Sequence, residues 1–143
     1  MTVTAYINHE LGLRVHRIAG RATAREFLQA VSFYRAHPDY ARTDLITLVD
    51  DNVDVSHLSP GDLDGLRAAF QNLYKTLDLQ IVLRSAWVCS SVRAWPLIEE
   101  WLRDRHSRDV MATEVSLVAR LEEANDLFDA SELAAVRTWT GFE

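Results

Sequence analysis

The stretch Leu45-Ile-Thr-Leu-Val-Asp-Asp-Asn-Val-Asp-Val-Ser-His-Leu-Ser-Pro-Gly-Asp-Leu63 indicates the fold more clearly than any other part of the chain. The residues from Leu45 to Val49 are apolar or β-branched, which predicts a strand that is covered on both faces. Ser59, Pro60 and Asp62 then match an N-cap, a proline at the first helical position and an acid in the first turn. In α/β proteins, binding sites tend to lie where a strand feeds a helix in this way.

Strand and helix patterns alternate on both sides of this stretch. We expect strands at 2–7, 13–18, 44–49, 80–88 and 114–119, the fourth having its apolar core at Ile81, Val82 and Leu83. We expect helices at 23–37, 59–77, 93–106, 121–128 and 131–139. A hairpin followed by strand–helix alternation predicts one α/β domain over residues 1–143, in the order β-β-α-β-α-β-α-β-α. Its five-stranded sheet should be mostly parallel, with right-handed crossovers that place helices on both faces.

Local signals predict where the helices begin and which side they bury. Thr23 and Glu26 match a capping box for the first helix, and Ser131 is expected to cap the last one. Pro96 must lie in the first turn of the third helix, because deeper in a helix it would cost about 3 kcal/mol. The second helix has one apolar stripe, formed by Leu63, Leu66, Phe70, Leu73 and Leu77.

Composition narrows the classes of function. The chain has 143 residues, 48% of them hydrophobic, which suits one domain with its own core. A net charge of −6 argues against nucleic-acid binding and is compatible with at most weak peripheral association with a membrane. The single cysteine, Cys89, excludes an internal disulfide and fits a reducing compartment. With no signal-like segment at the start, we expect a cytoplasmic protein, and the sequence leaves a homodimer open.

Four segments look like parts of a known family. They are Leu13 to Thr23, Leu45 to Leu63, Gln80 to Trp95, and Glu114 to Phe128. In order and local pattern they resemble the SpoIIAA-like (STAS/SEC14-type) family of small bacterial proteins. The resemblance covers nearly the whole chain and rests on topology more than on chemical motifs. It implies a SpoIIAA/STAS-like fold and a regulatory or ligand-binding domain that is not an enzyme, with membrane association or lipid-like ligands in some relatives.

One turn departs from the wider superfamily. There, anti-sigma-factor antagonists carry a phosphorylatable serine at the start of the second helix. Here the turn reads Leu58-Ser-Pro-Gly-Asp62, and Pro60 stands where that serine would lie. Ser59 is the nearest hydroxyl, but we expect it to cap the helix. The sequence therefore argues against a phosphorylation switch of that type.

The acidic loop holds the densest group of potential ligands. Asp50, Asp51, Asp54 and His57 could bind a hard cation, which makes a metal-dependent phosphoryl-transfer or hydrolase domain the alternative hypothesis. The other interpretation is a solvated loop whose acids stabilise turns and the nearby helix N-terminus. A phospho-acceptor receiver is disfavoured, because no lysine follows the last strand and Lys75 lies on the second helix.

The loop after the fourth strand offers two further possibilities. Cys89 and His57 could act as nucleophile and base, although a thiol at the end of an apolar strand is usually buried and inert. Ser90, Ser91 and Arg93 could bind an anion at a helix N-terminus, although capping alone explains serines there. The other histidines, His9, His16, His37 and His106, are interpreted as surface or turn residues.

Aromatic residues gather near the second and third helices. Trp87, Trp95, Trp101 and Tyr74 could line an apolar cleft or a partner surface, or simply fill the core. We expect Trp101 to be a core residue, and Trp95 is the strongest candidate for a pocket or interface residue. We therefore predict a non-enzymatic domain that binds a partner protein or a small apolar ligand near the strand-end loops, with no cofactor, metal or catalytic residue. The candidate binding residues are Asp50, Asp51, Asp54, Ser56, His57, Ser59, Cys89, Ser90, Ser91, Arg93 and Trp95.

Overall fold

The structure, a computed structural model, describes residues 3–77, 84–102 and 114–138. The strands are β1 (Val3–Asn8), β2 (Leu13–Ile18), β3 (Asp44–Val49), β4 (Arg84–Cys89) and β5 (Glu114–Val118). The α-helices are α1 (Ala24–Ala36), α2 (Pro60–Thr76), α3 (Trp95–Leu102) and α4 (Ala130–Thr138). Short 3₁₀ helices occupy Pro38–Arg42 and Leu121–Ala124. The predicted order of strands and helices is confirmed, except that the helix expected at 121–128 is only the 3₁₀ helix Leu121–Ala124.

All the strands form one mixed sheet whose spatial order, β1-β2-β3-β4-β5, is also their order in the chain. β1 pairs with β2 antiparallel, and the remaining neighbours pair in parallel. The predicted mostly parallel five-stranded sheet with an antiparallel edge strand is therefore confirmed.

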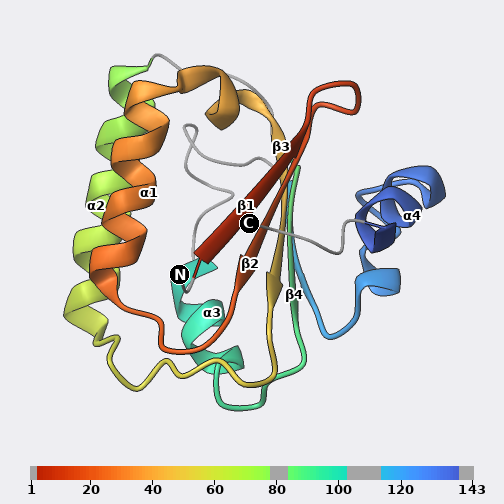
Figure 1. The fold of residues 1–143 in the computed structure, drawn as a ribbon. Helices are drawn as coiled ribbons and strands as arrows, with labels where there is room; N and C mark the ends of the chain where they lie inside the picture. The colour runs from red at the N-terminus through yellow and green to blue at the C-terminus, as the bar shows by residue number, and fades with distance from the viewer. Residues whose placement is uncertain (1–2, 78–83, 103–113, 139–143) are drawn as a thin grey trace.

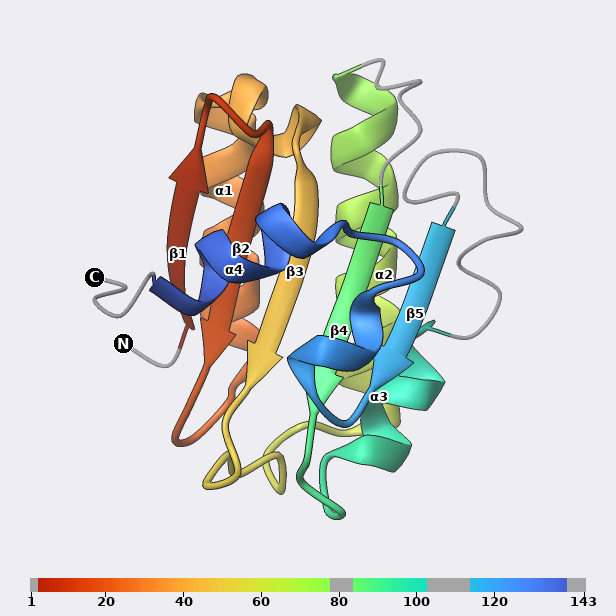
Figure 2. The same cartoon turned by 90° about the vertical axis from the view of Figure 1, so that its right-hand side faces the viewer.

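The helices are distributed differently from the expectation. Figure 1 shows the sheet nearly edge-on, with α1 and α2 on one side and α4 on the other. In Figure 2, α4 lies in front of the sheet, whereas α1, α2 and α3 lie behind it. Both faces do carry helices, but the three crossover helices share one face, because the strand order advances in one direction and never reverses. The sheet therefore has no switch point of the kind at which doubly wound sheets bind ligands.

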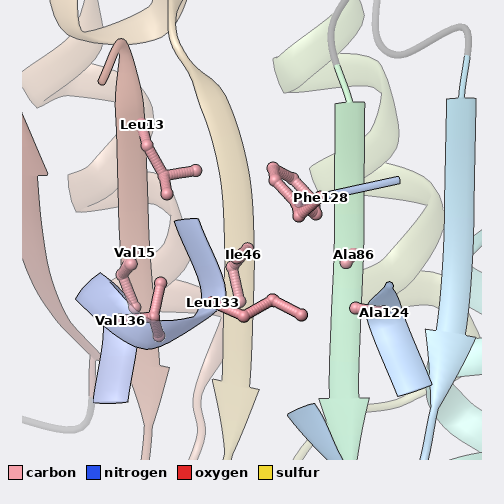
Figure 3. Close-up of a cluster of buried hydrophobic side chains, with 8 residues drawn as sticks. All are labelled: Leu13, Val15, Ile46, Ala86, Ala124, Phe128, Leu133 and Val136. Carbon is pink, nitrogen blue, oxygen red and sulfur yellow. The ribbon is translucent and has the colours of Figure 1, made fainter. Parts of the chain in front are cut away.

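The face under α4 is a packed apolar core. Figure 3 shows side chains of β2, β3 and β4 in contact with side chains of the C-terminal segment, residues 121–138. The residues of this core are Leu13, Val15, Ile46, Ala86, Ala124, Phe128, Leu133 and Val136. Each is at most 5% exposed. Alternation along β2 sends Arg14 and His16 to the opposite face, under α1 and α2, as the period of a strand requires.

Two predicted helix caps need correction. Thr23 does lie at the N-cap of α1, but its side chain makes no capping hydrogen bond. The last helix is capped by Asp129, which accepts from the amide of Glu132 at 2.8 Å, while Ser131 donates to Asp129. Asp129 was overlooked because Ser131 is as good a capping residue by type.

Other local predictions are confirmed. Ser59 caps α2 in a reciprocal capping box with Asp62, and Pro60 is the first helical residue. Pro96 lies in the first turn of α3. The predicted strand core at 81–83 and the predicted helix ends at 103–106 and Trp139 lie outside the described residues. None of the helices in the described ranges combines the length and apolar character that a membrane span requires.

Candidate functional site: a cavity between the sheet and its helices

A cavity of about 130 Å³ lies between the sheet and the layer formed by α1, α2 and α3. Its floor is the face of β2, β3 and β4 that is covered by α1, α2 and α3, and its roof is built from the inner faces of these helices. Most of the described residues that line it are aliphatic or aromatic, and they include Tyr74, Trp87 and Trp101. A mainly apolar pocket with a few converging polar groups is the usual form of a small-molecule site.

The polar groups of the floor gather on neighbouring strands. Residues of β2, β3 and β4 lie in rows across the sheet, and one row is Arg14, Leu45 and Ser85. The next row is His16, Thr47 and Trp87. All of these side chains line the cavity, so its polar end lies over the first half of these strands.

Arg14 is the most unusual of these groups. It is only 3% exposed, and two of its donors, Nε and Nη1, are buried without a hydrogen-bond partner. The guanidinium lies over the ring of Tyr34, 4.6 Å from its centroid. Stacking engages the face of the guanidinium, whereas its N–H groups point outward in the plane. The contact with Tyr34 therefore leaves those two donors unused.

Thr47 repeats this pattern one strand away. It is 1% exposed, and its Oγ1 is also buried without a partner. Each buried polar atom left unpaired costs about 1–3 kcal/mol, and native proteins keep few of them. Three such atoms therefore lie on two residues of one cavity.

The prediction that His16 is a surface or turn residue is wrong, because His16 lies in β2 and lines the cavity. Its Nε2 forms a hydrogen bond with the Tyr34 hydroxyl in the cavity wall. Burial lowers the pKa of His16 well below its usual value, and the charge of Arg14 lowers it further. Burial also raises the pKa of Tyr34, against the opposing effect of Arg14. Both partners are therefore neutral at pH 7, and Arg14 supplies the charge.

The other end of the cavity is apolar. There the wall comes from the segment between β3 and α2, through Val53, Val55 and Leu58, and from α3, through Leu97 and Ile98. The strand-end loop that we expected to bind a ligand therefore does contribute to the cavity. Its contribution is aliphatic side chains, while its acids point to other partners.

Asp50 and Asp51 make contacts outside the cavity. Asp50 accepts two hydrogen bonds from Arg17, at 3.0 and 2.8 Å, in a partly exposed ion pair. Asp51 accepts from the hydroxyl of Ser90, joining the loops after β3 and β4. These contacts are typical of carboxylates that hold loops in place.

The next residues of the acidic loop stabilise turns. Asp54 accepts from both the amide and the hydroxyl of Ser56, which lowers the pKa of Asp54. The imidazole of His57 lies 4.0 Å from the same carboxylate. The hydroxyl of Ser59 accepts from the amide of Asp62 as the cap of α2.

The loop after β4 shows the same character. The buried thiol of Cys89 donates to the carbonyl of Ser91 at 3.5 Å, and burial raises the pKa of that thiol. Ser91 also accepts from the amide of Ala94, while Arg93 is exposed. Trp95 packs against the cluster around Ile18 and Cys89. Of the described residues that line the cavity, none belongs to the predicted binding set.

The alternative hypothesis of a metal site requires a cluster of metal-ligating side chains. Within residues 3–77, 84–102 and 114–138, no three His, Cys, Asp or Glu side chains gather closely enough to hold a metal ion.

The sequence analysis did not select Arg14 and Thr47 as candidate site residues, although the sequence contains a signal for Arg14. Arg14 and His16 alternate with Leu13 and Val15 in a strand that has a neighbour on each side, where both faces become covered. Of the aromatic residues singled out in the sequence, Trp87, Trp101 and Tyr74 line the cavity, whereas Trp95, the strongest candidate, does not.

Comparisons with known proteins found no family model, no curated protein and no solved structure that matches the chain.

Proposed function

We propose that this chain is a non-enzymatic binding domain that holds a small, largely apolar ligand in the cavity between the sheet and α1–α3. The observation that carries the proposal is the cavity itself, about 130 Å³ lined by aliphatic and aromatic side chains around a few buried polar groups. An engineered cavity of about 150 Å³ holds benzene, so this slightly smaller cavity suits a ligand of about the size of benzene or slightly smaller.

The resemblance to SpoIIAA-like (STAS/SEC14-type) proteins supports this proposal in a second way. That family consists of regulatory and ligand-binding domains, some with lipid-like ligands, and the observed element order agrees with the order on which the resemblance rests. We therefore propose a STAS-type member that works by binding. A partner protein would then sense the ligand through the loops that cover the apolar end of the cavity.

An uncharged probe tests the proposal without presuming the chemistry of the natural ligand. 3-Bromopropan-1-ol is small enough for an apolar cavity of this volume, and its bromine quenches tryptophan fluorescence at contact. Because Trp87 and Trp101 line the cavity, we expect saturable quenching with one site per chain.

A matched pair of variants locates the binding. Ala94, fully buried in the cavity wall, is replaced in Ala94→Phe, which should remove the saturable quenching by filling the space. Val92, two residues away and 87% exposed, is replaced in Val92→Phe, which should bind as the wild type does. Linear, non-saturating quenching of the wild type, or equal quenching of a folded Ala94→Phe, would refute the proposal.

The metal-dependent alternative has its own test. A thermal-shift series with Mg²⁺, Mn²⁺ and Zn²⁺ would raise the melting temperature if the Asp50, Asp51 and Asp54 loop bound one of them. We expect no shift, because Asp50 and Asp54 are already engaged with Arg17 and Ser56.

A further inference from the structure

We infer that the ligand of this cavity is an amphipathic monoanion: a short-chain carboxylic acid whose carboxylate pairs with Arg14 and whose apolar body lies toward the loop after β3. This inference rests on the proposed function and adds to it the chemical class of the ligand and its orientation.

The charge of the cavity is the first argument. Arg14 is buried, and within the described ranges no carboxylate lies within ion-pair distance of it. The described lining residues include no Asp or Glu, and their only other basic residue is His16. Burial holds His16 in its neutral form at pH 7. The cavity therefore carries one positive charge, which one negative charge on a ligand would neutralise.

The unused donors are the second argument. Arg14 offers two buried donors without a partner, Nε and Nη1, which lie on different edges of the planar guanidinium. A carboxylate at either edge would accept a charge-assisted hydrogen bond from one of these donors and neutralise the buried charge. The unpaired hydroxyl of Thr47 lies on the neighbouring strand and the same face, so it is available to donate to the same head group.

The shape of the lining is the third argument. From the row of Arg14 to the strand ends, the floor changes from polar residues to Ile18 and Val49. Beyond them, the wall is completed by Val53, Val55 and Leu58. An acid with an alkyl or aryl body matches this gradient, whereas a sugar or an inorganic anion would leave the apolar end unfilled.

Matched ligands separate the charge from the apolar body. Pentanoate and pentanamide have the same chain and nearly the same head-group shape, but only pentanoate is charged at pH 7.5. Isothermal titration of delipidated wild-type protein should show pentanoate binding at least tenfold more tightly than pentanamide. Equal affinities would overturn the inference, because they would mean that ordered waters satisfy Arg14, while the proposed apolar site would still stand.

Variants of one strand identify the residue responsible. Arg14→Met should bind pentanoate no more tightly than pentanamide, while still binding the amide, and Arg14→Lys should keep a preference for pentanoate. Arg17→Met is the matched control, because Arg17 lies on the same strand but on the other face, exposed and paired with Asp50. It should discriminate as the wild type does.

The outcomes distinguish the two levels of the argument. Failure of the wild type to bind either compound would overturn both the inference and the proposed function. An unchanged preference for pentanoate in a folded Arg14→Met would overturn the inference alone, since the negative charge would then be recognised elsewhere.

Discussion

Two arginines on opposite faces of one sheet have contrasting surroundings. On the α4 face, Arg84 forms ion pairs with Asp44 and Glu132, with N–O distances of 2.7 and 2.8 Å. It also donates to the carbonyl of Leu127 at 2.8 Å and lies 4.5 Å from the ring centroid of Phe128. On the α1–α3 face, Arg14 has a similar aromatic neighbour, yet two of its donors are unpaired.

The contrast separates a residue that holds the fold from one that is available to a ligand. The hydrogen bonds that Arg84 donates to Glu132 and Asp44 raise its pKa and tie β3 and β4 to the C-terminal segment. Both arginines stack on a ring, so stacking alone does not explain why Arg14 is buried. Its burial without a carboxylate is a cost to the ligand-free protein, and a bound anion would remove that cost.

The largest expected effect is at Arg84. Arg84→Met leaves Asp44 and Glu132 as partly buried acids without their cation, and should lower the free energy of unfolding by about 3 kcal/mol. Urea unfolding measures this loss. Arg17→Met, which removes a more exposed ion pair, should lose less than about 1 kcal/mol and serves as the control. A loss at Arg84 no larger than at Arg17 would contradict the structural role of Arg84.

Replacing one buried alanine by valine on each face of the sheet compares how tightly the two faces are packed. Ala86 is fully buried in the core under α4, so Ala86→Val should cost about 1–3 kcal/mol through overpacking. Ala22 is equally buried but lines the cavity, so Ala22→Val should change stability by less than about 0.5 kcal/mol. The two unfolding curves check this difference, and an equal cost at both positions would indicate that the cavity is not open space.

The smallest expected effect is a pH dependence confined to the cavity face. The pKa of His16 is lowered in the folded protein, so the unfolded chain takes up the proton first as the pH falls. The stability contributed by neutral His16 is therefore fully present above about pH 6.5 and is lost below it, by up to about 1.4 kcal/mol per pH unit. Unfolding measured between pH 8 and pH 5 should show this slope in the wild type and a smaller slope in His16→Gln.

Much of the fold was predictable because its signals are local. The bounds of β2 and β3 agree with the prediction at each residue, and the α2 cap at Ser59 follows from three neighbouring residues. The distribution of the helices depends instead on strand order, which no local pattern encodes. Without that order, the crossover helices could not be assigned to one face.

The candidate site was predictable only in part, for the same reason. Acids and serines in loops attract attention as ligands, but Asp50, Asp54 and Ser59 are engaged in ion pairing, turn formation and capping. Arg14 looks like an ordinary outward-facing residue in an alternating strand. Only the packing of α1 and α2 over that face makes it a buried cation, so its importance emerges from tertiary structure.

The most direct test of the account is the stability of Arg14→Met in delipidated protein. If Arg14 is a buried cation kept for a ligand, its removal relieves two unpaired donors, and the free energy of unfolding in urea should stay equal or rise by about 1–2 kcal/mol. A loss of about 2 kcal/mol or more, similar to the loss at Arg84, would contradict the account by showing that Arg14 supports the fold.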